Sequence, residues 1–63
     1  MFKFQVGDRV RITDSRSADH GRTGKVEKAI VEQGTPVYWV RFEWLGEIGP
    51  LGRYTEDMLE AAA

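Results

Sequence analysis

Most of the side chains that could do chemistry surround the stretch HGRTGKV, residues 20 to 26. This stretch holds His20, the only histidine of the chain, together with Arg22, Lys25 and two glycines. A phosphate loop would need the pattern Gly-x-x-x-x-Gly-Lys-Ser/Thr running into a helix, because helix N–H groups complete the phosphate cradle. Here the glycine spacing differs and Val26 replaces the hydroxyl residue. We therefore do not predict a nucleotide-binding loop.

Two other interpretations of the stretch stay open. In the first, Gly21 and Gly24 supply positive-φ or bulge conformations where a loop enters a strand, as Gly7 supplies a turn before residues 9 to 13. In the second, cations on a flexible rim and its neighbouring strand contact phosphates or an acidic protein surface. The candidate contacts are Arg11, Arg16, His20, Arg22 and Lys25.

The charge of the chain is small overall but uneven along the sequence. The net charge is −1, yet residues 1 to 28 hold seven Lys and Arg against four acids. The remaining residues hold two Arg against six acids. This balance favours a basic N-terminal half, although strands from both halves can mix these charges in space.

Several function classes are disfavoured by residues that the chain lacks. Cysteine is absent, so we expect no disulfide, and one histidine with scattered carboxylates is a poor metal-ligand set. The same single histidine supports no Ser-His-Asp arrangement. The start MFKFQVGD has no apolar run long enough for a signal peptide or a membrane span. We predict a cytoplasmic protein with no catalytic residues, no metal and no cofactor, and no membrane partner.

The aromatic residues form a second candidate site. Alternation assigns Tyr38 and Phe42 to the core, which leaves Trp39, Trp44 and Tyr54 to be explained. They either cover the ends of a small core or form a contact surface for a peptide, a base or a second copy of the chain. Self-association through Trp39 is therefore one predicted oligomeric contact.

Strand signals dominate the sequence that positions these groups. GDRVRIT alternates strictly, and residues 25 to 31 change face between Val26 and Ile30, which predicts a bend or bulge. EQGTP is the next turn, and VYWVRFEW is the strongest strand. LGEIGPLG suits a hairpin or kinked strand, and RYTEDMLEAAA suits one 3₁₀ turn before a short strand at 59–60.

These elements predict one domain over residues 1–63. Short strands without crossover segments exclude a parallel sheet, so we expect an all-β antiparallel barrel of about five strands with one 3₁₀ turn near the C-terminus. The predicted core residues are Val10, Ile12, Val26, Ile30, Tyr38, Val40, Phe42 and Leu59.

The stretch VGDRVRIT…GRTGKVEKAI resembles the KOW motif, which forms the first hairpin of an SH3-like barrel. The matching positions are Gly7, Asp8, Val10, Ile12, Gly21, Gly24 and Val26. KOW domains contact RNA or protein in ribosomal proteins and transcription elongation factors, so the resemblance implies such a role. The chain is also distantly similar to the type II dihydrofolate reductases, whose active-site strand is matched here only at Tyr54.

The sequence as a whole favours a non-enzymatic binding module. Weak contact with RNA or DNA backbone through the basic loop and strand face is the leading prediction. A protein-protein interaction adaptor that uses exposed tryptophan or tyrosine is the alternative, and a reductase-like oligomeric enzyme is a remote third.

Overall fold

A computed structural model, which describes residues 1–62, shows one all-β sheet of five antiparallel strands with two 3₁₀ turns. In chain order the elements are β1 (Arg9–Ile12), β2 (Thr23–Glu32), β3 (Thr35–Phe42), η1 (Glu43–Leu45), β4 (Leu51–Thr55), η2 (Glu56–Met58) and β5 (Leu59–Ala61). The predicted fold class, strand number and C-terminal 3₁₀ turn are confirmed, whereas η1 was not predicted. Among residues 1–62, no helix is both long and apolar enough to cross a membrane.

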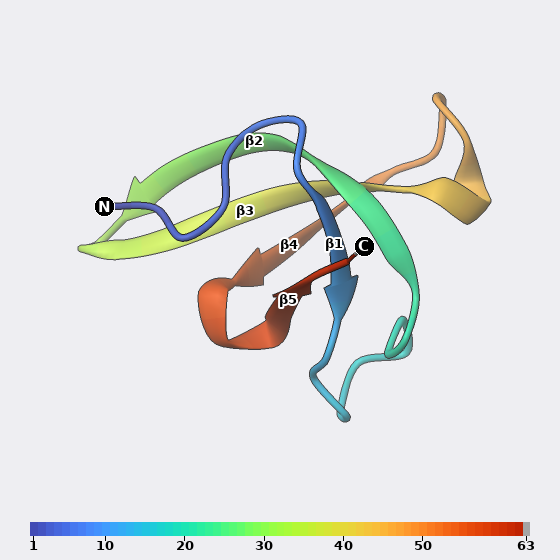
Figure 1. Ribbon diagram of the computed structural model, residues 1–63, viewed down its shortest axis with the longest axis horizontal. Helices are drawn as coiled ribbons and strands as arrows, with labels where there is room; N and C mark the ends of the chain where they lie inside the picture. The colour runs from blue at the N-terminus through green and yellow to red at the C-terminus, as the bar shows by residue number, and fades with distance from the viewer. Residues whose placement is uncertain (63) are drawn as a thin grey trace.

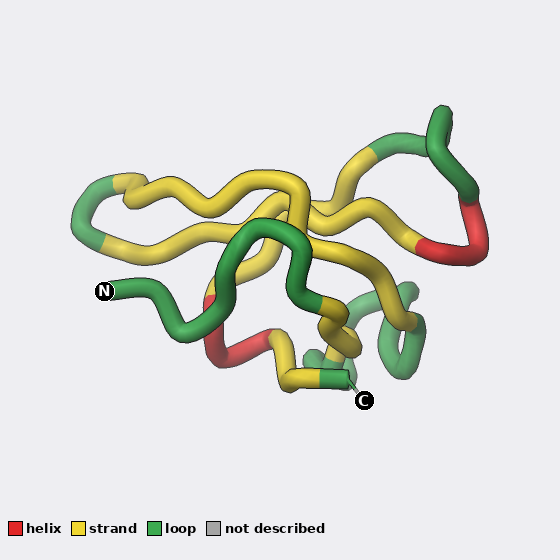
Figure 2. The backbone as a smooth tube through the Cα atoms, turned by 45° about the horizontal axis from the view of Figure 1, so that its top comes forward, coloured by secondary structure: helices red, strands yellow, loops and turns green. Residues whose placement is uncertain are grey.

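The strands follow the order β4-β3-β2-β1-β5, with every neighbouring pair antiparallel. Figures 1 and 2 show that the sheet curves strongly, so that the two edge strands approach each other. No hydrogen-bonded ladder joins β4 to β5 in the described chain, so a closed barrel is not confirmed. η2 connects these two strands directly. The loop between β1 and β2 contacts η2 and β4: Thr13 N donates to Met58 O at 2.8 Å, and Tyr54 Oη donates to Asp19 Oδ2 at 3.4 Å.

The core lies inside the curve of the sheet. It is a single cluster of buried side chains: Phe4, Val10, Ile12, Val26, Tyr38, Val40, Phe42, Tyr54 and Leu59. Seven of the eight predicted core residues are in it, and the exception is Ile30. The prediction missed Phe4 and Tyr54, which come from segments with no clear alternation.

A β-bulge explains why Ile30 is not in the core. Val26 pairs with Val40, but the next pair is Lys28 with Trp39, so Glu27 is one extra residue on β2. The bulge shifts the alternation by one position, and Ala29 rather than Ile30 faces Tyr38 and packs against the core. The predicted bulge is therefore confirmed, but the prediction that Ile30 faces the core after it is wrong.

Candidate functional site

The convex side of the sheet, opposite the core, is called the outer face here, and cations gather on it. Val10 and Val26 point inward, so Arg9, Lys25 and Arg41 point outward. Arg9 pairs with Lys25 across β1 and β2, and Lys25 pairs with Arg41 across β2 and β3. Three cations from three strands thus form one row, with neighbours roughly 5 Å apart in the hydrogen-bonding direction.

A second row lies beside the first, beyond the bulge. Lys28 on β2 pairs with Trp39 on β3, and Trp39 pairs with Arg53 on β4. Trp39 is half-buried, so part of its indole is accessible between two cationic side chains. The arrangement places an aromatic surface beside positive charge, as in sites that stack bases and hold phosphates.

The arginines of the outer face each hold a carboxylate. Arg11 pairs with Glu60 at 3.3 Å, and two closer pairs join Arg41 to Glu27 and Arg53 to Glu32. The exposed pairs of Arg11 and Arg53 are worth about 0 to 1 kcal/mol each, so a phosphate can compete with their carboxylates. Arg41 is held more firmly, because its guanidinium also donates to the backbone oxygens of Glu47 and Gly49.

The fourth pair is part of a small network. Arg9 Nε donates to Glu43 Oε2 at 2.6 Å, and Thr23 Oγ1 donates to Glu43 Oε1 at 2.7 Å. The hydrogen bond from Arg9, followed by that from Thr23, lowers the pKa of Glu43 from 4.5 to about 2. Glu43 is therefore ionised at any ordinary pH and fixes the orientation of Arg9.

The two lysines of the outer face differ from these arginines. Across residues 1–62, neither Lys25 nor Lys28 takes part in an ion pair. The outer face carries six cations against five carboxylates, a balance of +1, because Glu47 lines the same hollow as Lys25 and Arg41. The rest of the chain carries three cations and five carboxylates, a balance of −2.

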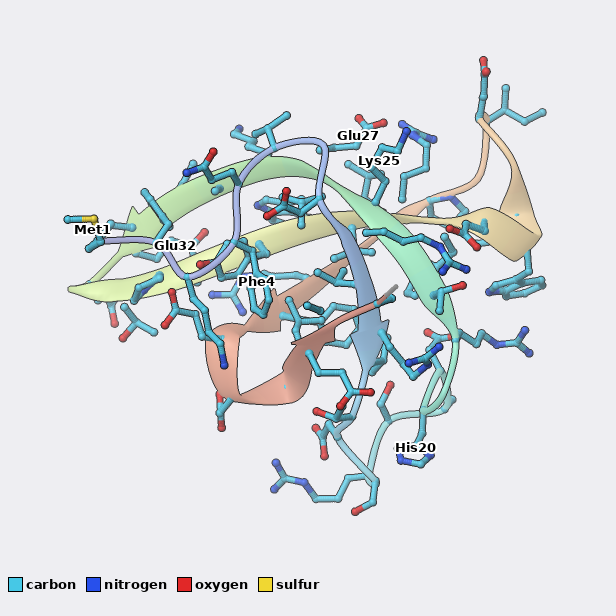
Figure 3. All side chains as sticks on the ribbon, in the orientation of Figure 1. Met1, Phe4, His20, Lys25, Glu27 and Glu32 are labelled. Atoms are coloured by element: carbon cyan, nitrogen blue, oxygen red, sulfur yellow. The ribbon has the colours of Figure 1, made fainter. Side chains whose placement is uncertain are left out.

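The structure does not bring the predicted phosphate-contact residues together in one place. Lys25 and Arg11 lie on the outer face, whereas Arg16 and His20 lie on the exposed loop between β1 and β2. Figure 3 shows His20 well away from Lys25 and Glu27. The loop carries its own carboxylates: Arg16 pairs with Asp14 at 3.2 Å, and the hydrogen bonds from Arg16 lower the pKa of Asp14.

Arg22 lies just before β2 and is engaged twice. Its guanidinium stacks over the Trp44 ring at 4.1 Å and pairs with Asp19 at 3.4 Å. Trp44 is 54% exposed, so part of its ring is accessible to a partner. A shallow hollow of about 470 Å³ adjoins it, lined by Gly21, Arg22, Thr23, Glu43 and Trp44.

Tyr54 does not belong to an exposed aromatic surface, and its assignment as a contact residue is wrong. Its side chain is 8% exposed and packs edge-to-face on Phe42 with ring centroids 6.2 Å apart. It is buried because β4 aligns Tyr54 with Tyr38 on the inner side of the sheet. Burial raises the pKa of its hydroxyl.

The three glycines of the predicted site have two different roles. Gly7 and Gly21 adopt φ of 98° and 85°, as expected for glycines at turns. Gly24 has no positive φ and lies within β2, so its assignment to a turn or bulge is wrong. A Cβ at Gly24 would lie 2.5 Å from the backbone oxygen of Arg41, which means that close strand approach requires glycine there.

The sequence missed four of the outer-face cations: Arg9, Lys28, Arg41 and Arg53. Alternation was the available signal, since it puts Arg9 on the same face as Arg11 and Arg41 on the same face as Trp39. The described residues include no group of three His, Cys, Asp or Glu side chains arranged to hold a metal ion.

Comparison with known proteins finds no matching family model, no matching curated protein and no matching solved structure. The similarity to the KOW motif therefore stays a hypothesis, and the function has to be argued from the geometry of the outer face.

Proposed function

We propose that this chain binds single-stranded nucleic acid through the outer face of its sheet. The observation that carries the proposal is the cross-strand register that places the row Arg9, Lys25, Arg41 beside Trp39. Positive side chains would contact phosphates along the strand, and the exposed part of Trp39 would stack on an unpaired base.

The chemistry supports a single strand rather than a duplex. In a duplex the bases are stacked on one another, so none of them offers a free face to Trp39. A duplex would then contact only the charged side chains around Trp39. An unpaired base offers its π-face to Trp39, and each such stack is worth about 1 to 3 kcal/mol. Phosphate contacts carry little sequence information, so the affinity is expected to be weak and to fall with salt.

A fluorescence titration with mixed-sequence single-stranded RNA at low salt tests this proposal. Trp39→Ala should weaken binding by about tenfold or more, because it removes a stacking surface. Trp44→Ala is the matched control, since Trp44 lies on η1 and its ring is already covered on one side by Arg22. Absence of binding at about 100 μM, or equal losses in both variants, would refute the assignment to the outer face.

The segment made of η1 and the loop that follows it favours a second candidate function, contact with another protein. Trp44 and Ile48 in this segment are 54% and 99% exposed, and exposed apolar side chains of this kind are typical of protein contacts. On this alternative, RNA binding is absent and Trp44→Ala abolishes partner binding. A second copy of the chain is the simplest partner, and sedimentation at high protein concentration tests it, with Trp39→Ala as a variant for the half-buried tryptophan of the outer face.

A further inference from the structure

A second hollow opens on the outer face, at the hairpin that joins β2 to β3. It has a volume of about 620 Å³ and is lined by Glu32, Gln33, Thr35, Val37, Arg53 and Thr55. Arg53 also flanks Trp39 in the row described above. A base that follows the one stacked on Trp39 can therefore reach this hollow without leaving the outer face.

The hollow is lined mainly by polar side chains. Val37 lies at its base but is 1% exposed, so it offers almost no surface to a ligand. The carboxylate of Glu32 and the guanidinium of Arg53 form an ion pair, and the Thr55 side chain lies at the rim. A donor group beside an acceptor group suits the edge of a base.

The ion pair of Glu32 with Arg53 places a hydrogen-bond acceptor beside a hydrogen-bond donor at the hollow. The guanidinium only donates hydrogen bonds, and an ionised carboxylate only accepts them. Guanine presents an acceptor, O6, next to two donors, N1–H and N2–H, along one edge. Arg53 can donate to O6 while Glu32 accepts from both nitrogens. Adenine and cytosine can each offer the carboxylate one amino donor, and uracil can offer one ring N–H, whereas guanine alone presents donors on two adjacent nitrogens.

We infer that this hollow is a subsite for guanine within the bound single strand, an inference that rests on the proposed function. Gln33, which adopts φ of 51° in the hairpin turn and is the one non-glycine residue with positive φ in residues 1–62, also lines the hollow. Its side-chain amide offers one further acceptor and two further donors to a base held there.

Anisotropy titrations with labelled ten-nucleotide uridine strands test the subsite. The strands carry one central guanosine, adenosine or cytidine, and the guanosine strand is expected to bind about tenfold more tightly, because a bidentate contact discriminates by that order. Glu32→Gln should reduce this preference for the guanosine strand to less than twofold. The salt dependence of binding should stay equal to that of the parent protein. Glu27→Gln is the matched control, since its carboxylate also pairs with an outer-face arginine, Arg41, but lies outside the hollow.

The outcomes separate the subsite from the proposed function. Equal binding of all strands, or a guanosine preference that survives Glu32→Gln, would overturn the subsite and leave strand binding intact. No binding of any strand would refute both. Guanosine monophosphate should bind at least tenfold more weakly than the guanosine strand, because it lacks the other phosphates. Equal affinity for guanosine monophosphate and for the guanosine strand would refute the view that the hollow is a subsite within a longer nucleic-acid site.

Discussion

Replacing Tyr38 with phenylalanine tests how the N-terminal segment is held on the core. The Tyr38 hydroxyl accepts from Lys3 N at 3.0 Å and Phe4 N at 3.2 Å, and it donates to Glu56 Oε2 at 2.6 Å. Phenylalanine keeps the ring, including its edge-to-face contacts with Phe2 and Phe4 at 5.9 and 5.4 Å. The substitution therefore removes one oxygen and little else.

The expected cost follows from the groups left without partners. Phe4 is 4% exposed, so its N–H loses its partner in a place that water reaches poorly, which costs about 1 to 3 kcal/mol. Lys3 N still donates to Glu56 at 2.8 Å, so that amide adds little to the loss. For a domain of this size the melting temperature should fall by about 5 to 20 °C.

Urea unfolding followed by tryptophan fluorescence measures the loss, with an unchanged m-value expected because the core stays packed. Phe2→Leu is a useful control, since Phe2 touches the Tyr38 ring but not its hydroxyl. A Tyr38→Phe midpoint equal to that of the parent protein would refute the view that this hydroxyl fastens the N-terminal segment.

Three further substitutions test other parts of the fold. Gly24→Ala should destabilise the domain by about 1 to 3 kcal/mol in urea unfolding, because its Cβ would meet a backbone oxygen at 2.5 Å; an unchanged midpoint would contradict the close approach of β2 and β3. Gln33→Asn should stabilise it by about 0.5 kcal/mol, since asparagine tolerates positive φ better, and a loss of stability would argue against a strained turn. Glu43→Gln should make stability fall less steeply between pH 5 and pH 2. The Glu43 pKa is lowered from 4.5 to about 2, so its ionised form contributes stability above pH 4.5 that is lost as pH falls toward 2. Equal pH profiles of the parent protein and the Glu43→Gln variant would contradict this.

Local patterns were sufficient for most of the fold. The strict alternation at Val10 and Ile12 and the β-rich run around Val40 each predicted a strand and its inward face correctly. The bulge near Val26 was also predicted, but Ile30 was placed inside, because the phase of a strand after a bulge depends on its partner's register. Phe4 was missed, since its segment has no regular structure and reaches the core through long-range contacts.

The candidate site was harder to predict than the fold. Lys25 was identified from its own neighbourhood in the sequence, but its position between Arg9 and Arg41 depends on pairing between residues that are 16 positions apart on either side. Tyr54 was assigned to the surface because the glycines before it obscured the alternation that buries it. Side-chain type can be read along the chain, whereas a cross-strand row exists only once the register is set.

The salt dependence of RNA binding tests the proposed outer-face contact most directly. The affinity of the parent chain for mixed-sequence single-stranded RNA should fall linearly with salt on a double-logarithmic plot. Replacing Lys25 and Lys28 together with alanine should reduce the slope by about 1.4, or 0.7 for each lost contact on a single strand. Lys3→Ala is the control, since Lys3 lies on the inner side of the sheet, with its backbone N–H bonded to Tyr38 and its ammonium over the Phe4 ring. The proposed contact predicts a reduced slope in the double variant and an unchanged slope in the control; equal slopes in all three proteins, or no binding at low salt, would contradict it.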